Sequence, residues 1–392
     1  MNYRKFRADY LFTGSALLDN NSVLITDEMG TILDIIPFDP FIEGVENYNG
    51  ILSPGFINSH CHLELSHLDN KIPEKTGLPD FVVKVVTERE YAEEEILDAM
   101  NKAIATMARN GIVALGDICN TRLALPIKKH SALTFYNFIE VSGWNPLVAN
   151  ERLERIMGIY EDYLAQGEQA AIVPHAPYSV SSPLWEIITP FFVGKTITIH
   201  NQETPGENEF FLKGTGELNR MYQLMNLENS SFKSPGTTSL QSFFHRTKAA
   251  ASLILVHNTF ISQQDLDYIK EKKPPYQSVF FCLCPNANYY IENMLPPIPL
   301  LMKNDVQIVL GTDSLASNHQ LDILEEIKTI SLNFPSVETE ALLTWATLNG
   351  AKALQLDERF GGFEPGKQPG VVLIENVEDR KITAQSTSRK IL

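Results

Sequence analysis

Cysteine, basic residues and long apolar runs are all scarce in this chain of 392 residues. Its four cysteines, Cys61, Cys119, Cys282 and Cys284, fall mostly within predicted buried strands. We therefore expect free thiols and a cytoplasmic location rather than disulfides. Lysine and arginine total 32 against 48 acidic residues, so the formal net charge is −16. Without a basic patch to neutralise phosphates, nucleic acid is not an expected partner.

No apolar run approaches the length of a membrane span, and the first thirty residues lack the apolar core of a signal peptide. We expect no membrane association, while assembly into a homo-oligomer stays open. The hydrophobic content of 44% is ordinary for a globular protein and sufficient for a large core.

What the sequence does contain is a pair of histidines, His60 and His62, at the end of an apolar run that begins at Ile51. Residues i and i+2 of a strand point to the same face, so both imidazoles project together. Neutral imidazole is a common ligand of transition metals, and the pair predicts half of a metal site. A chance pair of histidines on a surface strand is the alternative.

Four later apolar runs also end in a residue that can bind a metal or transfer a proton. They end at His175, His200, His257 and Asp313, and Glu203 follows His200 by three residues. A single histidine in this position is usually a packed core residue. In a parallel barrel, however, the carboxyl ends of all strands open on one face, where active sites lie. The repeated pattern therefore predicts one shared site.

These segments resemble the amidohydrolase superfamily, in the same order and over nearly the whole chain. The segments are Pro54-Gly-Phe-Ile-Asn-Ser-His-Cys-His62, His200-Asn-Gln-Glu203, His257 and Gly311-Thr-Asp-Ser314. More narrowly, they look like the branch of metal-dependent deaminases and chlorohydrolases. The stretch His62-Leu-Glu-Leu-Ser-His-Leu68 is similar to the aminodeoxyfutalosine deaminase group within that branch.

The resemblance implies that His60, His62, His200 and Asp313 hold one divalent metal ion. Zn²⁺ is expected, with Fe²⁺ as the alternative. A single ion is implied because the two-metal relatives often carry a bridging lysine on strand four. That strand reads Ala170-Ala-Ile-Val-Pro-His-Ala-Pro here and contains no lysine.

Three residues are expected to be catalytic: Glu203, His257 and Asp313. A carboxyl group just past a strand end, such as that of Glu203, can act as a general acid and base, although a solvated loop glutamate is the alternative. By resemblance, His257 orients and deprotonates a metal-bound water beside Asp313. Whether His257 also touches the metal stays open.

Four further residues are candidate substrate contacts because they follow predicted strands: His175, Glu64, Trp144 and Ser314. The competing interpretation is structural in each case. His175 could be a packed histidine that fixes its loop, and Ser314 could cap a helix.

The predicted fold is α/β, a (β/α)8 TIM barrel with a small β-sandwich built from both termini. Strand candidates begin near residues 51, 111, 132, 170, 195, 252, 278 and 305, with helical patterns between them. The barrel is expected over residues 54–359, and the sandwich over 1–53 and 360–392, with a hairpin at Met29-Gly30. The segment 201–248 is too long for a plain connection, so we expect it to be functional or mobile.

The expected function is hydrolytic deamination of a small aminated heterocycle, a purine or purine nucleoside derivative, with release of ammonia. A strongly acidic chain disfavours polyanionic ligands at long range, so a largely uncharged ring is expected. The alternative is hydrolysis of an amide, a cyclic amide or a carbon–halogen bond. A non-catalytic metal-binding barrel is a third hypothesis, which Glu203 disfavours because metal storage needs no proton shuttle.

Overall fold

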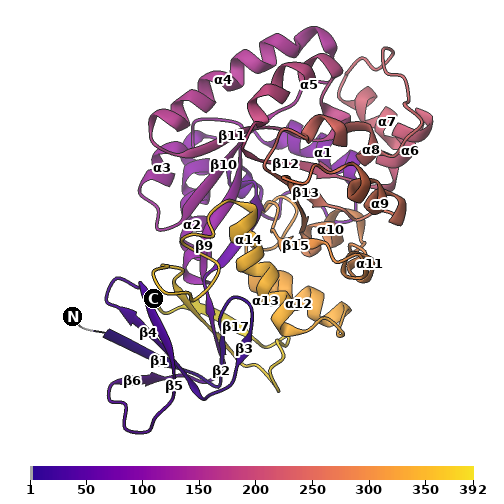
Figure 1. The fold of residues 1–392 in the computed structure, drawn as a ribbon. Helices are drawn as coiled ribbons and strands as arrows, with labels where there is room; N and C mark the ends of the chain where they lie inside the picture. Colours follow the sequence, from indigo (N-terminus) through magenta and orange to yellow (C-terminus); the bar gives the residue numbers. More distant parts are fainter. Residues whose placement is uncertain (1–2) are drawn as a thin grey trace.

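Parallel strands form the centre of the molecule in the computed structural model, which describes residues 3–392 (Figure 1). They lie in two four-stranded sheets with the orders β11-β10-β9-β8 and β12-β13-β14-β15. The bounds of these strands are β8 (Phe56–Cys61), β9 (Ile112–Cys119), β10 (Thr134–Val141), β11 (Gln169–Pro174), β12 (Thr196–Asn201), β13 (Ser252–His257), β14 (Ser278–Leu283) and β15 (Gln307–Leu310). Strands alternate with helices, so the fold is TIM-barrel-like, as predicted.

The two sheets meet at the carboxyl ends of their outer strands. Between β11 and β12, the backbone N–H of His200 donates to the carbonyl oxygen of His175 over 3.0 Å. At the opposite seam, the N–H of Thr312 donates to the carbonyl oxygen of His60 over 3.0 Å. Cys61 and Asp313 also form an isolated parallel bridge there. These contacts bring the strand ends that carry the predicted site residues together.

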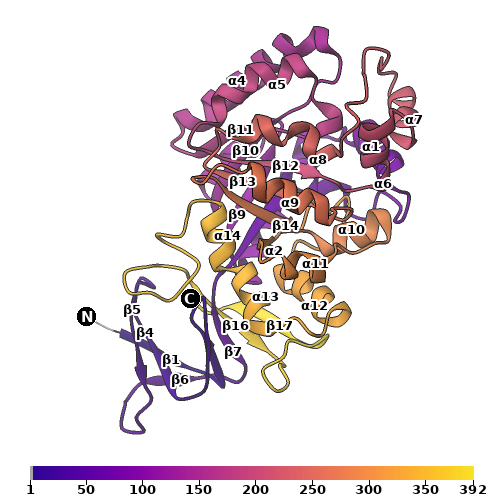
Figure 2. The same ribbon diagram turned by 45° about the vertical axis from the view of Figure 1, so that its right-hand side comes forward.

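Helices surround the strands, and Figures 1 and 2 show α4 and α5 beside β10 and β11 in both views. On α4, Ile156, Ile159 and Tyr163 recur at spacings of three and four residues, and this apolar face is buried. No helix within residues 3–392 has the length and hydropathy of a membrane span. The helix bounds are α1 (Leu78–Glu88), α2 (Glu93–Arg109), α3 (Leu125–Lys129), α4 (Ala149–Ala165), α5 (Ser182–Ile188), α6 (Pro205–Lys213), α7 (Glu217–Leu224), α8 (Ser239–Phe243), α9 (Gln263–Lys272), α10 (Pro285–Glu292), α11 (Ile298–Lys303), α12 (Ile323–Asn333), α13 (Thr339–Ala346) and α14 (Leu348–Ala353).

Strands from both ends of the chain form two further sheets, of orders β5-β4-β1-β6 and β17-β16-β7-β2-β3. Apolar side chains of both sheets share one buried cluster, which includes Phe6, Leu24, Leu52 and Leu373. The predicted hairpin at Met29-Gly30 is present as antiparallel β4 and β5. The bounds are β1 (Tyr3–Arg7), β2 (Tyr10–Phe12), β3 (Leu17–Leu18), β4 (Ser22–Asp27), β5 (Ile32–Pro37), β6 (Val45–Asn47), β7 (Ile51–Pro54), β16 (Val371–Glu375) and β17 (Thr387–Lys390).

The apolar run from Ile51 to His62, which we predicted to be one strand, is two. β7 pairs with β16 and β2 in the terminal sheets, whereas β8 pairs with β9 at the centre. Gly55 lies between them, where a Cβ atom would come within 2.3 Å of the Val113 side chain and 2.5 Å of the Pro369 carbonyl oxygen. Only glycine fits so close an approach, and the chain changes sheets there.

The long segment 201–248 contains α6, α7 and α8 rather than one irregular loop. Its buried residues Phe210, Leu218 and Tyr222 belong to a cluster that also includes Leu78 and Phe81 of α1. The segment therefore packs with α1 beside the carboxyl ends of the strands.

Candidate metal and active site

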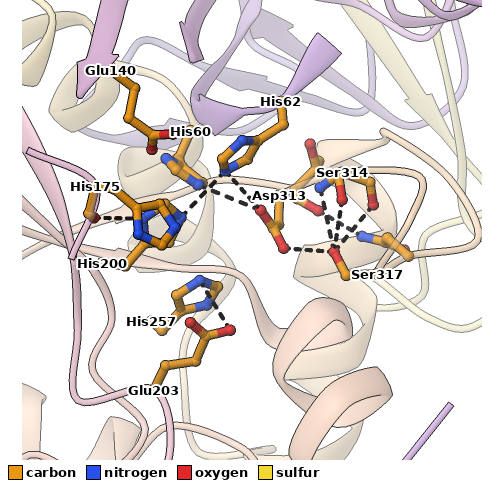
Figure 3. Close-up of polar contacts among 12 residues, drawn as sticks. His60, His62, Glu140, His175, His200, Glu203, His257, Asp313, Ser314 and Ser317 are labelled. Carbon is orange, nitrogen blue, oxygen red and sulfur yellow. Dashed lines mark hydrogen bonds and ion pairs between the residues drawn. The ribbon is translucent and has the colours of Figure 1, made fainter. Parts of the chain in front are cut away.

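Four histidines and an aspartate converge where the central strands end (Figure 3). His60 lies in β8 and His62 directly follows it, while His200 and His257 lie at the ends of β12 and β13. Nε2 of His62 lies 3.2 Å from Nε2 of His200 and 3.3 Å from Oδ1 of Asp313. Nε2 of His60 lies 3.5 Å from the same carboxylate oxygen. Residues far apart in the sequence thus form one compact cluster.

The free nitrogen atoms of this cluster suit a divalent cation. Both ring nitrogens of His60 and Nε2 of His257 are buried without a hydrogen-bond partner. Nδ1 of His200 donates to the carbonyl oxygen of His175 over 2.8 Å, so its Nε2 is left free to bind a metal. One ligand atom from each of His60, His200, His257 and Asp313 lies within 4.8 Å of the others. This group contains His257, which was not a predicted ligand, and does not contain His62, which was.

Left-handed backbone conformations recur at the strand ends. The φ angles are 47° at Gln202, 72° at His257, 58° at Asn258 and 57° at Asp313. This region is uncommon for residues other than glycine and costs roughly 1–3 kcal/mol at each position. Such strain concentrates at functional sites, and here it turns the chain sharply beside Glu203, His257 and Asp313.

Burial disfavours the charged form of the His62, His200 and His257 imidazoles. Burial lowers the pKa of His200 and of His257 to about 3, and protonation of either ring beside the other histidines is further disfavoured. Burial likewise lowers the pKa of His62 well below its ordinary value, and that of His175 to about 4. Neutral imidazole is the form that binds metals.

Asp313 stays ionised despite its burial. Burial alone would raise its pKa, but the His60 imidazole, 3.5 Å from Oδ1, and the nearby His62 and His257 hold the pKa well below the ordinary value. Its second oxygen, Oδ2, accepts a hydrogen bond from Oγ of Ser317 over 2.5 Å. The carboxylate is thus anionic and fixed in orientation.

Glu203 is buried beside His257, with 3.4 Å between Oε1 and Nε2, but without hydrogen-bond geometry. Burial raises the pKa of Glu203 well above its ordinary value, and the charges of Asp313 and Glu207 raise it further. The backbone N–H groups of Gln202 and Glu203 donate to the Glu207 carboxylate over 2.9 and 3.2 Å. A carboxyl group with a raised pKa is therefore held next to the histidine cluster.

A cavity of about 440 Å³ opens above the cluster. His62, His200, Glu203, His257 and Asp313 line it, together with apolar side chains of α1 and α7. Three of the predicted substrate contacts also line it: Trp144, His175 and Ser314. Trp144 stacks on Tyr222 at 5.1 Å between ring centroids, and its Nε1 donates to Asn229 over 2.8 Å.

Glu64, the fourth predicted substrate contact, lies elsewhere. Its carboxylate accepts hydrogen bonds from the backbone N–H groups of Asn120 and Thr121 and from the Thr121 hydroxyl, at 2.8–3.2 Å. It is absent from the cavity lining. The prediction is corrected: Glu64 fixes the segment that follows β9, because that turn exposes N–H groups without a backbone partner.

The sequence analysis missed Glu140 and three arginines of the cavity wall. Glu140, near the end of β10, is 9% exposed and accepts a hydrogen bond from Asn120 over 3.0 Å. Arg89, Arg152 and Arg155 line the cavity, and within the described residues none of them forms an ion pair. Nε of Arg152 is buried without a partner. Glu140 obeys the strand-end pattern and could have been found; the arginines carry no such signal.

The chain belongs to the amidohydrolase family, whose model matches residues 51–391. The adenosine deaminase of Helicobacter pylori is 28% identical over 329 residues, covering 82% of this chain and 78% of the relative. The crystal structure of the aminofutalosine deaminase of Helicobacter pylori in complex with methylthio-coformycin has a TM-score of 0.81 at 22% identity. It covers 96% of this chain and 93% of its own.

The crystal structure of an adenosine deaminase from Xanthomonas campestris, with bound zinc, has a TM-score of 0.67 at 22% identity. It covers 95% of this chain and 84% of its own. These likenesses extend over both the central strands and the terminal sheets.

Proposed function

We propose that this chain is a metal-dependent hydrolytic deaminase of an aminated purine or purine nucleoside derivative. The observation that carries the proposal is the buried Glu203 beside a histidine–aspartate cluster in the lining of a cavity of about 440 Å³. The names of the relatives, adenosine deaminase and aminofutalosine deaminase, support the same reaction and substrate class.

One divalent ion would be held by His60, His62, His200 and Asp313, with His257 next to it. Neutral imidazoles and one carboxylate favour Zn²⁺, as does the zinc of the Xanthomonas campestris protein, while Fe²⁺ accepts the same ligands. When bound, the ion would act as a Lewis acid and make water acidic enough to serve as a nucleophile near neutral pH.

The side chains around it would move the protons. Glu203 would donate a proton to the ring nitrogen next to the aminated carbon, which makes that carbon more electrophilic. After water has added, the Glu203 carboxylate would take up the proton that His257 received from the water and pass it to the departing amine, and the remaining hydroxyl proton would return Glu203 to its acid form. His257, 3.4 Å from Glu203, would orient the water and accept its proton, together with Asp313. The balance is one water consumed and one ammonia released, with a carbonyl in place of the amine.

The cavity wall would select the substrate. The Trp144–Tyr222 stack offers a flat apolar surface to a ring, and His175 and Ser314 offer polar contacts. The unpaired Arg89, Arg152 and Arg155 favour a substituent that carries negative charge on the outer part of the molecule. The region around the reacting ring itself would accept an uncharged heterocycle.

We further propose the architecture that organises these residues. The two central sheets would form one closed (β/α)8 barrel over residues 54–359, supported by the backbone contacts at both seams. The terminal strands would form a β-sandwich over 1–53 and 360–392, supported by their shared apolar cluster. Residues 1 and 2 of that range lie outside the described residues.

Hydrolysis of an amide, a cyclic amide or a chlorinated ring is the second candidate, because the same metal ligands serve these reactions. Protonation by Glu203 favours deamination, since the ring nitrogen next to the aminated carbon must be protonated to make that carbon electrophilic. A barrel that only stores metal would have no use for this buried acid.

Ammonia release tests the proposal. The Zn²⁺-loaded protein should deaminate at least one of a panel of purines and adenosine derivatives that includes neutral and carboxylate-bearing 5′ substituents. If the arginines bind the substituent, Arg152→Ala should raise KM only for the substrates with a carboxylate-bearing 5′ substituent. Cleavage of amides or chlorinated rings without any ammonia release from the purine panel would favour the second candidate instead.

A further inference from the structure

The strand that carries His60 is irregular just before it ends. Asn58 of β8 pairs with Leu115 of β9, and Cys61 pairs with Asp117. The chain therefore advances three residues along β8 but only two along β9. Such a bulge interrupts the ladder of backbone hydrogen bonds and redirects the side chains next to it. The end of β8 therefore needs another attachment to β9.

A side chain of β9 provides this attachment. The backbone N–H of Leu63, the residue directly after His62, donates to Oδ1 of Asp117 over 2.9 Å. Asp117 is fully buried and does not line the cavity. Its carboxylate thus accepts the hydrogen bond that a backbone carbonyl would accept in a regular ladder, at the point where the pairing of β8 and β9 is irregular.

Lys128 of α3 holds that carboxylate in turn. Its Nζ lies 2.5 Å from Oδ2 of Asp117, and both side chains are 0% exposed. The same Nζ donates to Oδ1 of Asn137 over 2.7 Å. One carboxylate oxygen therefore serves Lys128 and the other serves Leu63, and no water reaches either.

A buried ion pair of this kind rarely adds stability, because the cost of removing both charges from water offsets their attraction. A positional role explains why it is present here. We propose that the side-chain acceptor of Asp117, which receives the Leu63 N–H and is held by Lys128, positions the end of β8, and through it the imidazoles of His60 and His62. The inference rests on the proposed metal site, because its consequence is the strength of metal binding.

Two double variants separate the ion pair from the acceptor that it provides. Asp117→Asn/Lys128→Met removes both charges but keeps a side-chain oxygen opposite the Leu63 N–H. Asp117→Leu/Lys128→Met removes both charges and the acceptor at similar volume. Thermal unfolding reports on packing, and competition with a chelator reports on Zn²⁺ affinity without any turnover.

We expect the Asn/Met variant to bind Zn²⁺ nearly as tightly as the parent protein. The Leu/Met variant should bind it roughly 10–100-fold more weakly, the loss usual when a supporting hydrogen bond of a ligand is removed. Asp117→Val/Lys128→Met, with a β-branched residue suited to a strand, carries the same expectation if the leucine variant does not fold.

Equal Zn²⁺ affinities of the Asn/Met and the acceptor-free variants would overturn the positioning role. A parent protein that binds no divalent metal at all would instead overturn the proposed metal site, so the two failures are distinguishable. Lower affinity in the acceptor-free variant at an unfolding temperature equal to that of the Asn/Met variant supports the inference.

Discussion

Glu203 owes its chemistry to its surroundings rather than to its residue type. Its side chain is 4% exposed, and the nearest carboxylates carry negative charge that further disfavours its ionisation. Asp313, equally buried, is surrounded by imidazoles and remains anionic. Two carboxyl groups in one pocket are thus driven to opposite protonation states, which is the arrangement that an acid and a metal ligand require.

Replacing Glu203 by glutamine tests this assignment. The amide is nearly isosteric, so the fold and the bound metal should be retained, but it cannot transfer a proton. We expect kcat to fall by about 10²–10⁴ on the best substrate, with unchanged metal content by elemental analysis. Glu209→Gln, a change on the same segment at a residue outside the cavity lining, is the control. Near-normal turnover in the Glu203 variant would contradict the role.

Glu326 makes the stability of the fold depend on pH. Burial raises its pKa from an ordinary 4.5 to about 8, against the hydrogen bonds from Asn286 and Asn318. Between these values the folded state holds a proton that the unfolded state has lost. The contribution of Glu326 to the free energy of unfolding should therefore fall as pH rises from 4.5 to about 8, by at most about 1.4 kcal/mol per pH unit.

Denaturant unfolding of the parent and of Glu326→Gln across this range isolates the contribution, because all other groups titrate in both. The stability of the parent relative to the variant should decrease with rising pH and level off above about pH 8. A difference that does not change with pH would show that Glu326 is ionised in the folded protein.

The sequence predicts those site residues that lie at the ends of buried strands. His60, His200, His257 and Asp313 all do so, and they meet because parallel strands open on one face. Glu140 satisfies the same rule and was overlooked. The structure places Glu64 differently because a carboxylate after one strand can bind the backbone that follows the neighbouring strand, and the sequence does not record which N–H groups lack partners.

Two helices from separate insertions form the outer wall of the cavity. α1 follows β8, and α7 belongs to the segment after β12. The guanidinium of Arg220 on α7 makes a bidentate contact with Asp80 on α1, at 2.9 and 2.7 Å. Both side chains are 41% exposed, so the pair adds little to global stability. Its effect should instead be on the distance between the two helices.

Arg220→Ala should therefore raise KM clearly, while the unfolding temperature should fall only slightly. Loss of an exposed ion pair lowers the free energy of unfolding by roughly 0.2–1 kcal/mol. A larger distance between α1 and α7 weakens substrate binding. The matched control is Arg389→Ala, which removes an exposed pair with Glu375 in the terminal sheets. Steady-state kinetics of both variants decide: equal KM values would mean that the α1–α7 contact does not shape the cavity.

Among the helices and strands, the central strands could be predicted from the sequence, but the positions of α1 and α7, which line the cavity, could not. Apolar runs with strand-like composition recur with helical patterns between them, and the family match supports the fold that they indicate. The one long error, a single strand from Ile51, arose because hydrophobicity does not reveal a change of sheet at Gly55. α1 and α7 fold against each other, so no pattern within either segment predicts where it lies.

The chain is strongly acidic, but three arginines line its cavity. The formal net charge is −16, yet three arginines without ion pairs in the described part of the chain line the outer cavity. At physiological salt the field of distant carboxylates is screened beyond about 8 Å, so the local arginines dominate near the bound substrate. An acidic protein can thus accept a singly charged anionic substituent.

Metal binding should couple to the stability of the whole molecule, because its ligands come from strands at both ends of the central region. A ligand that binds only the folded state adds about 4 kcal/mol when its free concentration is a thousand times Kd. Chelation should therefore lower the unfolding temperature, and Zn²⁺ should restore it, at a stoichiometry of one ion per chain. His60→Ala should abolish this response, whereas His245→Ala, at an exposed position, should not. Two tightly bound ions per chain, or an unfolding temperature unaffected by chelation, would contradict a single metal held by these strands.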